Sequence, residues 1–489
     1  MIRALFSVSG LALAAVLFSP LTSNPLPIIN YSHQAEIVGT WLGTLAVQGT
    51  QLRIVFHIAE GEDGALTATM DSPDQGAVGI PVSEVTYAER HLKLVSAAVS
   101  GEFDGDLSAD GSQIVGEWRQ GGFTLPLTLT KTDEGIEGPS RPQEPEDPLP
   151  YDAEEVSYPN VVGGNELAGT LTLPRTGGPH PAVVLVSGSG AQDRNETVMG
   201  HRPFLVLSDH LTRNGIAVLR FDDRGVGGST GDFATATSED FATDVMASIN
   251  YLMGREDIAH GRIGVVGHSE GALIAPMVAV RSDDVAFIVL MAGPAVTGEE
   301  IILEQSALIS RASGRSEADI QDALATNERV FEIVTNESDP EVAAGQLEEL
   351  FRTVVSQMSA EERAQARLAD DEAVDTWIQG QVQRVNSNWI RFFLTYDPAP
   401  TLARVRVPIL AIAGELDLQV PPPQNLPVMR HVLEESGNPD YTVEELPGLN
   451  HLFQTATTGL PAEYRTIEET IAPAALQLIS DWILERVDG

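Results

Sequence analysis

Four short runs rich in Val, Ile, Leu and Ala, which alternate with longer amphipathic segments, constrain the fold of this chain more than any other feature. Each run is apolar at almost every position rather than at every second one, which is typical of strands buried on both faces. The alternation therefore predicts an α/β fold, with a mostly parallel sheet and helices on its two faces. The strands are expected at residues 181–186, 216–221, 263–266 and 286–291, and helices at 203–213, 239–253 and directly after residue 269.

Further segments complete the predicted sheet. An antiparallel lead-in strand is expected at residues 167–173, two more strands at 407–413 and 441–446, and a closing helix at 472–486. In a sheet of this kind, ligands bind beyond the carboxyl ends of the strands. Side chains that follow these strand ends are therefore the first candidates for a functional site.

Residues 267–271 read Gly-His-Ser-Glu-Gly and place Ser269 on the turn between a predicted strand and a predicted helix. A G-x-S-x-G pattern in this context is typical of a nucleophile elbow, in which a strained serine stands at the end of a strand. Gly267 and Gly271 allow the backbone to pack closely on either side, and the helix that begins at Glu270 directs free N–H groups toward developing negative charge. We take Ser269 as a candidate nucleophile; the alternative is a serine in an ordinary turn.

A serine nucleophile needs a base, and the base needs an acid that orients it. On the predicted fold these residues follow in the chain order Ser, Asp or Glu, and His. Asp417 follows the first and His451 the second of the two late strands, so both belong to the same edge of the sheet as Ser269. Glu415 is the alternative acid, and a hydrogen-bonded surface histidine is the alternative for His451.

An oxyanion hole requires N–H donors, of which one is expected to be the backbone of Glu270. The other is expected in the loop after the first strand of the parallel sheet, where Ser-Gly-Ser-Gly permits close approach of a substrate oxygen. In this loop the amide of Ser189 is the first choice and that of Gly190 the second. Asp193 and Arg194 are expected to pair and hold the loop; direct contact with substrate is the alternative.

Two other features are interpreted as structural. Residues 222–229, Asp-Asp-Arg-Gly-Val-Gly-Gly-Ser, resemble a phosphate loop but lack its G-K-[ST] ending, so an ordered turn is expected. His268 precedes the candidate nucleophile, yet an elbow turns neighbouring side chains away from the serine, so packing or a pocket wall is expected. The G-x-G of the oxyanion loop is not followed by the rest of a dinucleotide fingerprint. No metal or cofactor is expected.

Residues 298–397 interrupt the strand pattern with Glu-, Ala- and Gln-rich segments that have helical apolar spacing. Placed between strands of the sheet, such an insertion would cover the mouth of the site as a cap. A helical decoration packed elsewhere is the alternative.

Ahead of the α/β domain at residues 151–489, the chain shows two different patterns. Residues 36–131 form short alternating segments broken by Gly, Asp and Asn turns, which predict a small lipocalin-like β domain. Residues 132–150 are rich in Glu, Pro and Gly and predict a solvated linker. Within the β domain, aromatic residues expected to fill the interior stand two positions after a glycine, at Trp41, Phe103 and Trp118.

Residues 1–30 have the pattern of a secretory signal peptide, with Arg3 followed by an apolar run and then small and polar residues. The run is short for a membrane span, so a periplasmic or secreted location is expected, and an uncleaved signal anchor is the alternative. The chain has no cysteine, which removes thiol catalysis and disulfides from consideration. Its 70 acidic and 29 basic residues give a formal net charge of −41, so neither nucleic acid nor an anionic membrane surface is an expected partner.

Taken together, these motifs resemble the α/β-hydrolase superfamily. The segments that carry the resemblance are 187–194, 221–229, 267–271, 396–398, 414–420 and 449–454. The chain is similar in particular to exported bacterial serine esterases with an N-terminal β module and a helical cap, and distantly to dienelactone hydrolases and serine aminopeptidases. The resemblance implies Ser269, Asp417 and His451 as a catalytic triad. Dienelactone hydrolases proper carry a cysteine nucleophile, so their substrate is not carried over.

The expected activity is cleavage of small-molecule carboxylic esters with small to medium acyl chains through an acyl-enzyme. A serine peptidase acting on short peptides is an alternative, since Asp370, Asp371 and Glu372 in the cap are available to bind an amino terminus. An acyltransferase would use the same catalytic residues. A non-catalytic binding or scaffold protein is the alternative from another class.

Overall fold

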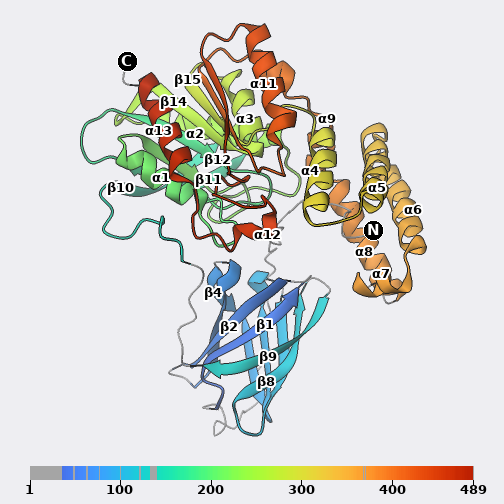
Figure 1. Cartoon of the computed structure of the whole chain (residues 1–489). Helices are drawn as coiled ribbons and strands as arrows, with labels where there is room; N and C mark the ends of the chain where they lie inside the picture. The colour runs from blue at the N-terminus through green and yellow to red at the C-terminus, as the bar shows by residue number, and fades with distance from the viewer. Residues whose placement is uncertain are drawn as a thin grey trace. The chain divides into compact units, whose positions relative to one another are not determined.

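The computed structural model of the protein describes residues 36–487 apart from 48–49, 62–63, 76, 100, 121–122, 133–139, 367 and 369 (Figure 1). The signal peptide expected at residues 1–30 lies outside the described residues. Two compact units make up the structure: one contains the N-terminal strands and extends to Pro142, and the other contains most of the chain from Gln143 onward. Each unit is described by itself.

The N-terminal unit is a nine-stranded antiparallel sheet with the strand order β4-β3-β2-β1-β9-β8-β7-β6-β5. Successive strands are neighbours except β4 and β5, which stand at the two ends of this order, and β9 returns beside β1, which is an up-and-down arrangement. The hydroxyl of Ser96 on β6 donates to the carbonyl oxygen of Pro81 on β4 at 2.9 Å, so the sheet curls until its two ends meet. The strands are β1 Gly39–Val47, β2 Thr50–Glu60, β3 Leu66–Ser72, β4 Ala77–Val82, β5 Glu84–Ala88, β6 His91–Ser96, β7 Gly101–Leu107, β8 Gln113–Gln120 and β9 Phe123–Thr132.

Aromatic side chains fill the interior of this curled sheet, as predicted. Trp41, Phe103 and Trp118 are all buried, and the ring of Phe56 lies 6.0 Å from that of Phe103 and 6.1 Å from that of Trp118. The glycine before Phe103 has a packing reason, because a β-carbon added at Gly101 would lie 2.3 Å from the Trp118 ring. At this position the glycine of the pattern is therefore needed so that the aromatic ring of Trp118 can pack against the backbone.

The second unit is built on an eight-stranded sheet with the order β10-β11-β13-β12-β14-β15-β16-β17. Strands β12 to β17 run parallel, which confirms the predicted mostly parallel sheet. Strand β11 is the antiparallel lead-in, and β10 pairs with it at the edge. The strands are β10 Asp152–Asn160, β11 Asn165–Leu173, β12 His180–Val186, β13 Ala217–Phe221, β14 Ile258–His268, β15 Val285–Met291, β16 Ile409–Gly414 and β17 Tyr441–Leu446.

Helices cover both faces of this sheet. Successive residues of a strand point to opposite faces, so each strand contributes side chains to two cores. Val184 and Val265 belong to the core beneath α2, α3 and α11, whereas Val183 and Val266 belong to the core beneath α1 and α13. This explains why the strand segments are continuously apolar. The helices are α1 Pro203–Arg213, α2 Ser238–Met253, α3 Glu270–Ala279, α11 Pro422–Ser436 and α13 Pro473–Val487, with the short α10 Ala399–Leu402 and α12 Pro461–Tyr464.

The predicted helical insertion between β15 and β16 is confirmed. Its helices are α4 Gly298–Ala312, α5 Glu317–Asn336, α6 Pro340–Gln357, α7 Ala360–Gln365, α8 Asp371–Val385 and α9 Asn388–Thr395. They share a core of their own, centred on large apolar side chains such as Phe331, Leu347 and Phe351. A side-chain cap begins each of these six helices, and that of α4 is Thr297, whose hydroxyl accepts from the amide of Glu300. The capping residues of the other five are Ser316, Asp339, Ser359, Asp370 and Ser387.

Candidate active site at the strand ends

Ser269 stands on a strained turn between β14 and α3. Its φ of 53° and ψ of −113° lie outside the regions that L residues favour, and its amide donates to the carbonyl oxygen of Met291 at 2.8 Å. The two flanking glycines are required by close approach: a β-carbon at Gly267 would lie 2.1 Å from the oxygen of Gly271, and one at Gly271 would lie 2.0 Å from the oxygen of Val186. The turn therefore has the form of a nucleophile elbow, with a half-buried serine.

Asp417 and His451 lie together beyond the ends of β16 and β17. Nδ1 of His451 is 2.8 Å from Oδ2 of Asp417. The other carboxylate oxygen accepts hydrogen bonds from the amides of Gln419 at 2.8 Å and Val420 at 2.9 Å. Both side chains are buried. Because Nδ1 is engaged by the carboxylate, Nε2 is the ring nitrogen left for a reacting group.

Glu415, the alternative acid, has a different partner. Glu415 is exposed, and its Oε2 accepts a hydrogen bond from the amide of Gly448 at 2.8 Å. The structure thus brings Asp417 to His451, and Glu415 to the turn that precedes the histidine loop.

The loop that carries His451 is organised by Asn450, a residue not singled out from the sequence. Oδ1 of Asn450 accepts hydrogen bonds from the amides of Leu452 and Gln454, both at 3.0 Å, and its Nδ2 donates to Oε1 of Gln454 at 2.9 Å. Asn450 and Gln454 are fully buried. A short polar side chain that bonds its own following backbone is a local signal for such a turn.

The predicted oxyanion loop lies directly against the elbow. A β-carbon added at Gly188 would lie 3.2 Å from Cβ of Ser269, so only glycine permits this approach without displacement. The amide of Gly188 already donates to Oε1 of Glu196 at 2.7 Å. It is therefore not free to meet a substrate oxygen, and Ser189 supplies the next amide along the loop. Gly190, the second choice, has a φ of 103°.

His268 has a more specific environment than the packing or pocket-wall position expected for it. Its Nδ1 is 2.8 Å from Oε1 of Glu196, and its Nε2 is 3.0 Å from the carbonyl oxygen of His451. The two histidine rings lie 4.8 Å apart between centroids. Burial alone would lower the pKa of His268, but the charge and hydrogen bond of Glu196 raise it above its ordinary value.

The side chain of Glu270 connects the elbow to two other elements. Its Oε1 accepts hydrogen bonds from the hydroxyl of Ser238, at the start of α2, at 2.5 Å and from Nε1 of Trp389, on α9, at 2.7 Å. Burial raises the pKa of the Glu270 carboxyl, while these two hydrogen bonds oppose that rise. The side-chain Nδ2 of Asn388, also on α9, makes a second link by donating to the carbonyl oxygen of Thr235 at 3.1 Å. The helical insertion therefore packs at the site.

The predicted pairing of Asp193 with Arg194 is wrong. Arg194 instead forms ion pairs with Asp222 at 2.8 Å and Glu155 at 2.5 Å, whereas Asp193 accepts from the hydroxyl of Thr197 at 2.8 Å. The reason is direction: Arg194 extends toward β10 and β13, and Asp193 turns back to its own backbone. Both residues still hold the loop.

The segment 222–229 is an ordered turn, as predicted. Asp222 accepts from the amide of Gly228 at 3.0 Å, and the hydroxyl of Ser229 donates to the carbonyl oxygen of Asp222 at 2.7 Å. Arg224 is buried and pairs with Asp244 on α2 at 2.7 Å. The turn therefore uses its polar groups internally.

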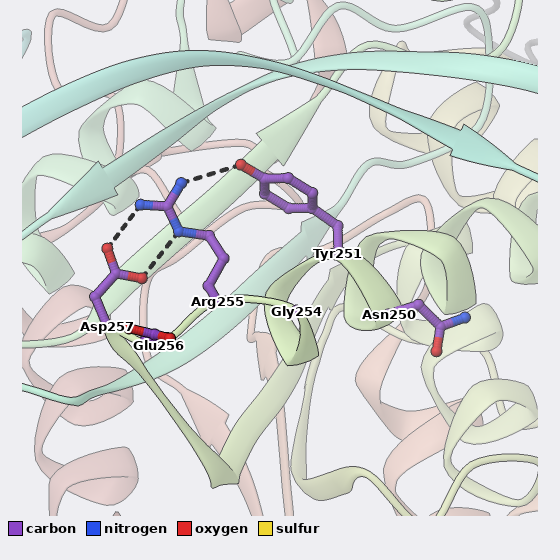
Figure 2. A pocket seen from close by; sticks show the side chains of 6 residues that line it. All are labelled: Asn250, Tyr251, Gly254, Arg255, Glu256 and Asp257. Carbon is purple, nitrogen blue, oxygen red and sulfur yellow. Dashed lines mark hydrogen bonds and ion pairs between the residues drawn. The ribbon is translucent and has the colours of Figure 1, made fainter.

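A hollow of about 10 Å³ lies behind the oxyanion loop, with Gly188, Asp223 and Glu270 among its lining residues. Such a volume matches roughly one water molecule and is too small for an acyl chain. A much wider surface hollow of about 700 Å³ lies where α2 ends, at the opposite end of β14 from Ser269 (Figure 2). There the cation of Arg255 is already paired with Asp257 at 2.6 Å and Glu154 at 2.8 Å, so this hollow is not an anion site.

Among the residues that the structure describes, no three or more His, Cys, Asp or Glu side chains are grouped as metal ligands would be. Within the same ranges, no helix has both the length and the apolar character needed to cross a membrane.

Comparison with known proteins agrees with this geometry. The model of the alpha/beta hydrolase family matches residues 183–459. Esterase EstD of Thermotoga maritima is 35% identical over 141 residues, which are 29% of this chain and 34% of EstD. An uncharacterized protein of Mycobacterium tuberculosis is 33% identical over 125 residues, which are 26% of this chain and 41% of that protein. The chain thus spans well under half of the length of these relatives.

Two solved structures contain chains that resemble this one. A Pyrococcus furiosus esterase has a TM-score of 0.42 and 16% identity, and the match covers 72% of this chain and 98% of the esterase. Est1E of Butyrivibrio proteoclasticus, in a structure with bound ferulic acid, has a TM-score of 0.38 and 16% identity, with 68% and 100% covered.

Proposed function

Because this chain belongs to the alpha/beta hydrolase family, we propose that it is a serine carboxylesterase in which Ser269 is the nucleophile, His451 the base and Asp417 the orienting acid. The observation that carries the proposal is the 2.8 Å contact of the His451 and Asp417 side chains at the strand ends where the elbow places Ser269. The name of the similar Thermotoga maritima protein, an esterase, supports the reaction class.

In the proposed reaction, Oγ of Ser269 attacks the ester carbonyl carbon while Nε2 of His451 takes the hydroxyl proton. Asp417 stabilises the imidazolium that forms, and the imidazolium then donates its proton to the departing alcohol. A water molecule next attacks the acyl-enzyme, with His451 again as the base, and the acid product leaves. The cycle needs no metal or other cofactor.

The negative charge that develops on the carbonyl oxygen requires preorganised N–H donors. We assign the amide of Glu270 as one donor, since it begins a helix and has no partner one turn earlier. The amide of Ser189 is the proposed second donor, and Gly190 is the reserve. The fixed bond from Gly188 to Glu196 supports this choice, because it takes the preceding amide out of use.

The proposed substrates are carboxylic esters with small to medium acyl chains, bound between the oxyanion loop and the helical insertion. A peptidase would need acids that bind an amino terminus, and the candidates lie at the start of α8. There all three acids are exposed and Asp370 caps the helix through the amide of Ala373 at 2.9 Å. This helix-capping role favours the esterase. The signal-peptide pattern of residues 1–30 supports a proposed periplasmic or secreted location.

A substrate panel tests the proposal. Purified protein is offered p-nitrophenyl esters from acetate to decanoate and, in parallel, aminoacyl p-nitroanilides. We expect turnover of the shorter esters and little turnover of the anilides. Preference for the anilides would establish the peptidase instead. Acceptor alcohols added to the ester reaction reveal an acyltransferase if they divert the acyl group from water. Failure of a fluorophosphonate probe to label Ser269 would favour a non-catalytic protein.

A further inference from the structure

One unbroken chain of hydrogen bonds joins the oxyanion loop to the loop of the proposed base. The amide of Gly188 donates to Oε1 of Glu196 at 2.7 Å, and the same oxygen is 2.8 Å from Nδ1 of His268. Nε2 of His268 then lies 3.0 Å from the main-chain oxygen of His451. His268 is 5% and Glu196 3% exposed, so water does not compete for these contacts.

The contacts determine where protons lie. The carbonyl oxygen of His451 can only accept, so Nε2 of His268 must carry a hydrogen. At 2.8 Å, Nδ1 of His268 and Oε1 of Glu196 cannot face one another with lone pairs alone, so a second proton lies between them. The other oxygen of Glu196, Oε2, is buried and has no hydrogen-bond partner among the described residues. The shared proton is therefore what offsets the carboxylate charge.

Glu196 is also held in an uncommon backbone conformation. Its φ is 53°, in the left-handed region that few non-glycine residues occupy. Its amide donates to the carbonyl oxygen of Asp193 at 2.9 Å, and the preceding Asn195 accepts a hydrogen bond from the buried Arg220. Strain of this kind persists where surrounding contacts impose it, and it is concentrated at functional sites. Here it aims the carboxyl group at Gly188 and His268.

We propose that His268 and Glu196 form a positioning pair for the esterase reaction, which holds the oxyanion loop in register with the base His451 by means of a shared buried proton. The inference rests on the proposed function, since it assigns a role to residues that do not contact the reacting atoms. Gly188 lies against Ser269 and precedes Ser189, so a shift of Glu196 moves the proposed oxyanion donor directly. A displacement of about 1 Å in such a donor costs roughly 100-fold in rate.

The pair also makes the site sensitive to alkaline pH. The charged and titratable groups that act on the His268 ring are Glu196, Asp417 and the adjacent His451. The raised pKa of His268 means that the shared proton is retained below that pKa and lost as the pH rises through it. Its loss leaves an uncompensated buried anion beside the oxyanion loop.

Two variants test the pair. Glu196→Gln keeps the shape and an acceptor for Gly188 but cannot share the proton, and His268→Gln keeps one donor. We expect kcat for a p-nitrophenyl ester to fall about 100-fold in each, with KM changed less than about threefold. The double variant should be no worse than the poorer single variant, because the residues act as one unit. Glu256→Gln and His260→Gln, at exposed positions, serve as matched controls and should retain wild-type rates.

The pH profile separates positioning from mere structural support. Wild-type protein should lose kcat at alkaline pH, and His268→Gln should lack this alkaline limb. Folded variants with kcat within about twofold of wild type, or with an unchanged profile, would overturn the proposal. If a variant does not fold, ring ¹⁵N spectra of histidine-labelled wild-type protein decide instead. A buried imidazole that holds both ring protons at neutral pH supports the pair, and the absence of such a ring refutes it.

The same ester assay distinguishes this inference from the proposed function on which it rests. Wild-type protein and Ser269→Ala are assayed beside the pair variants. Wild-type protein without ester turnover, or Ser269→Ala with full turnover, would refute the esterase proposal. An active wild type and an inactive Ser269→Ala, together with pair variants of normal rate and normal pH profile, would refute the positioning pair alone.

Discussion

Nε1 of Trp389, on the cap helix α9, donates a 2.7 Å hydrogen bond to the carboxylate of Glu270, the residue that follows Ser269. The two residues are 119 positions apart in the sequence. The same carboxylate oxygen accepts the hydroxyl of Ser238 from α2. Because the amide of Glu270 is a proposed oxyanion donor, its buried side chain links helix α9 to the turn of the proposed nucleophile.

The hydrogen bond from Trp389 to Glu270 predicts that Trp389→Phe lowers both stability and activity. The substitution retains an aromatic ring against Phe393, whose ring lies 4.9 Å from that of Trp389, but it removes the N–H donor. Loss of a hydrogen bond to a buried carboxylate costs about 1–2 kcal/mol, so we expect a lower Tm and a kcat/KM for esters reduced about fivefold or more. Trp377→Phe, which changes a cap ring that packs on Phe351, is the matched control. Equal kcat/KM in the two variants would contradict a role of the Trp389–Glu270 hydrogen bond in activity.

The close approach at the elbow predicts opposite outcomes for two glycine substitutions. Gly271→Ala would place a β-carbon 2.0 Å from the carbonyl oxygen of Val186, so the protein should lose several kcal/mol of stability, about 3 or more, and all ester turnover. Gly380→Ala, on α8, meets nothing within 4 Å and should stabilise the fold by about 0.5–1 kcal/mol. Thermal unfolding followed by circular dichroism measures both. A Gly271→Ala protein as stable as wild type would show that the elbow is not as tight as described.

The choice between two acids is tested by their amide variants. Asp417→Asn removes the charge that orients His451, and kcat for an ester should fall about 10⁴-fold, with the fold retained. Glu415→Gln changes the carboxylate that holds Gly448, and kcat should fall less than about threefold, as for loss of a surface contact. Steady-state kinetics on both proteins suffice. A larger loss in Glu415→Gln than in Asp417→Asn would reverse the assignment.

The ion pair of Asp222 and Arg194 predicts that the free energy of unfolding depends on pH in the acid range. Burial alone would raise the pKa of Asp222, but hydrogen bonds from Arg194 and backbone amides lower it below its ordinary value. The native state therefore binds this proton less readily than the unfolded chain, so the carboxylate stabilises the fold above about pH 4. That contribution is lost as the pH falls through the lowered pKa.

Asp222→Asn removes this contribution. At pH 7 the variant should be about 3 kcal/mol less stable than wild type, because the half-buried guanidinium of Arg194 loses its buried carboxylate partner. The difference should narrow as the pH falls below about 4 and through the lowered pKa of wild-type Asp222, where that carboxylate becomes protonated. Unfolding in denaturant at several pH values measures it, with the exposed Asp283→Asn as the control. A difference that stays constant with pH would contradict the linkage.

Elements with both faces buried were predictable from the sequence. The central parallel strands lie where continuous apolar runs occur, and the bounds predicted for α1 coincide with the structure. The bounds of the edge strand β17 also coincide, although none of its residues is buried. Strand β10 was missed because it lies at the sheet edge, where seven of its nine residues are exposed or half-buried and three of them are acidic. In β10 this exposed and polar stretch has little apolar alternation, so its local pattern did not reveal the strand.

The three proposed catalytic residues were also named from the sequence, since each follows a predicted strand in a fixed chain order. The contacts that hold them were not. Glu196 and His268 are 72 positions apart, and nothing near either residue indicates the other. For the same reason Arg194 was assigned to its neighbour Asp193, whereas its partners come from strands elsewhere in the sheet. Tertiary hydrogen bonds of this kind have no local sequence signal.

The central claim is that Ser269 is the nucleophile of an ester hydrolase, and the most direct measurement is kcat for a short-chain p-nitrophenyl ester with wild-type protein and Ser269→Ala. Mass spectrometry after fluorophosphonate treatment accompanies it. We predict turnover and a single adduct on Ser269 in the wild type, and in the variant a loss of about 10⁶-fold in kcat, an unchanged Tm and no adduct. Ester turnover by Ser269→Ala at the wild-type rate would contradict the account.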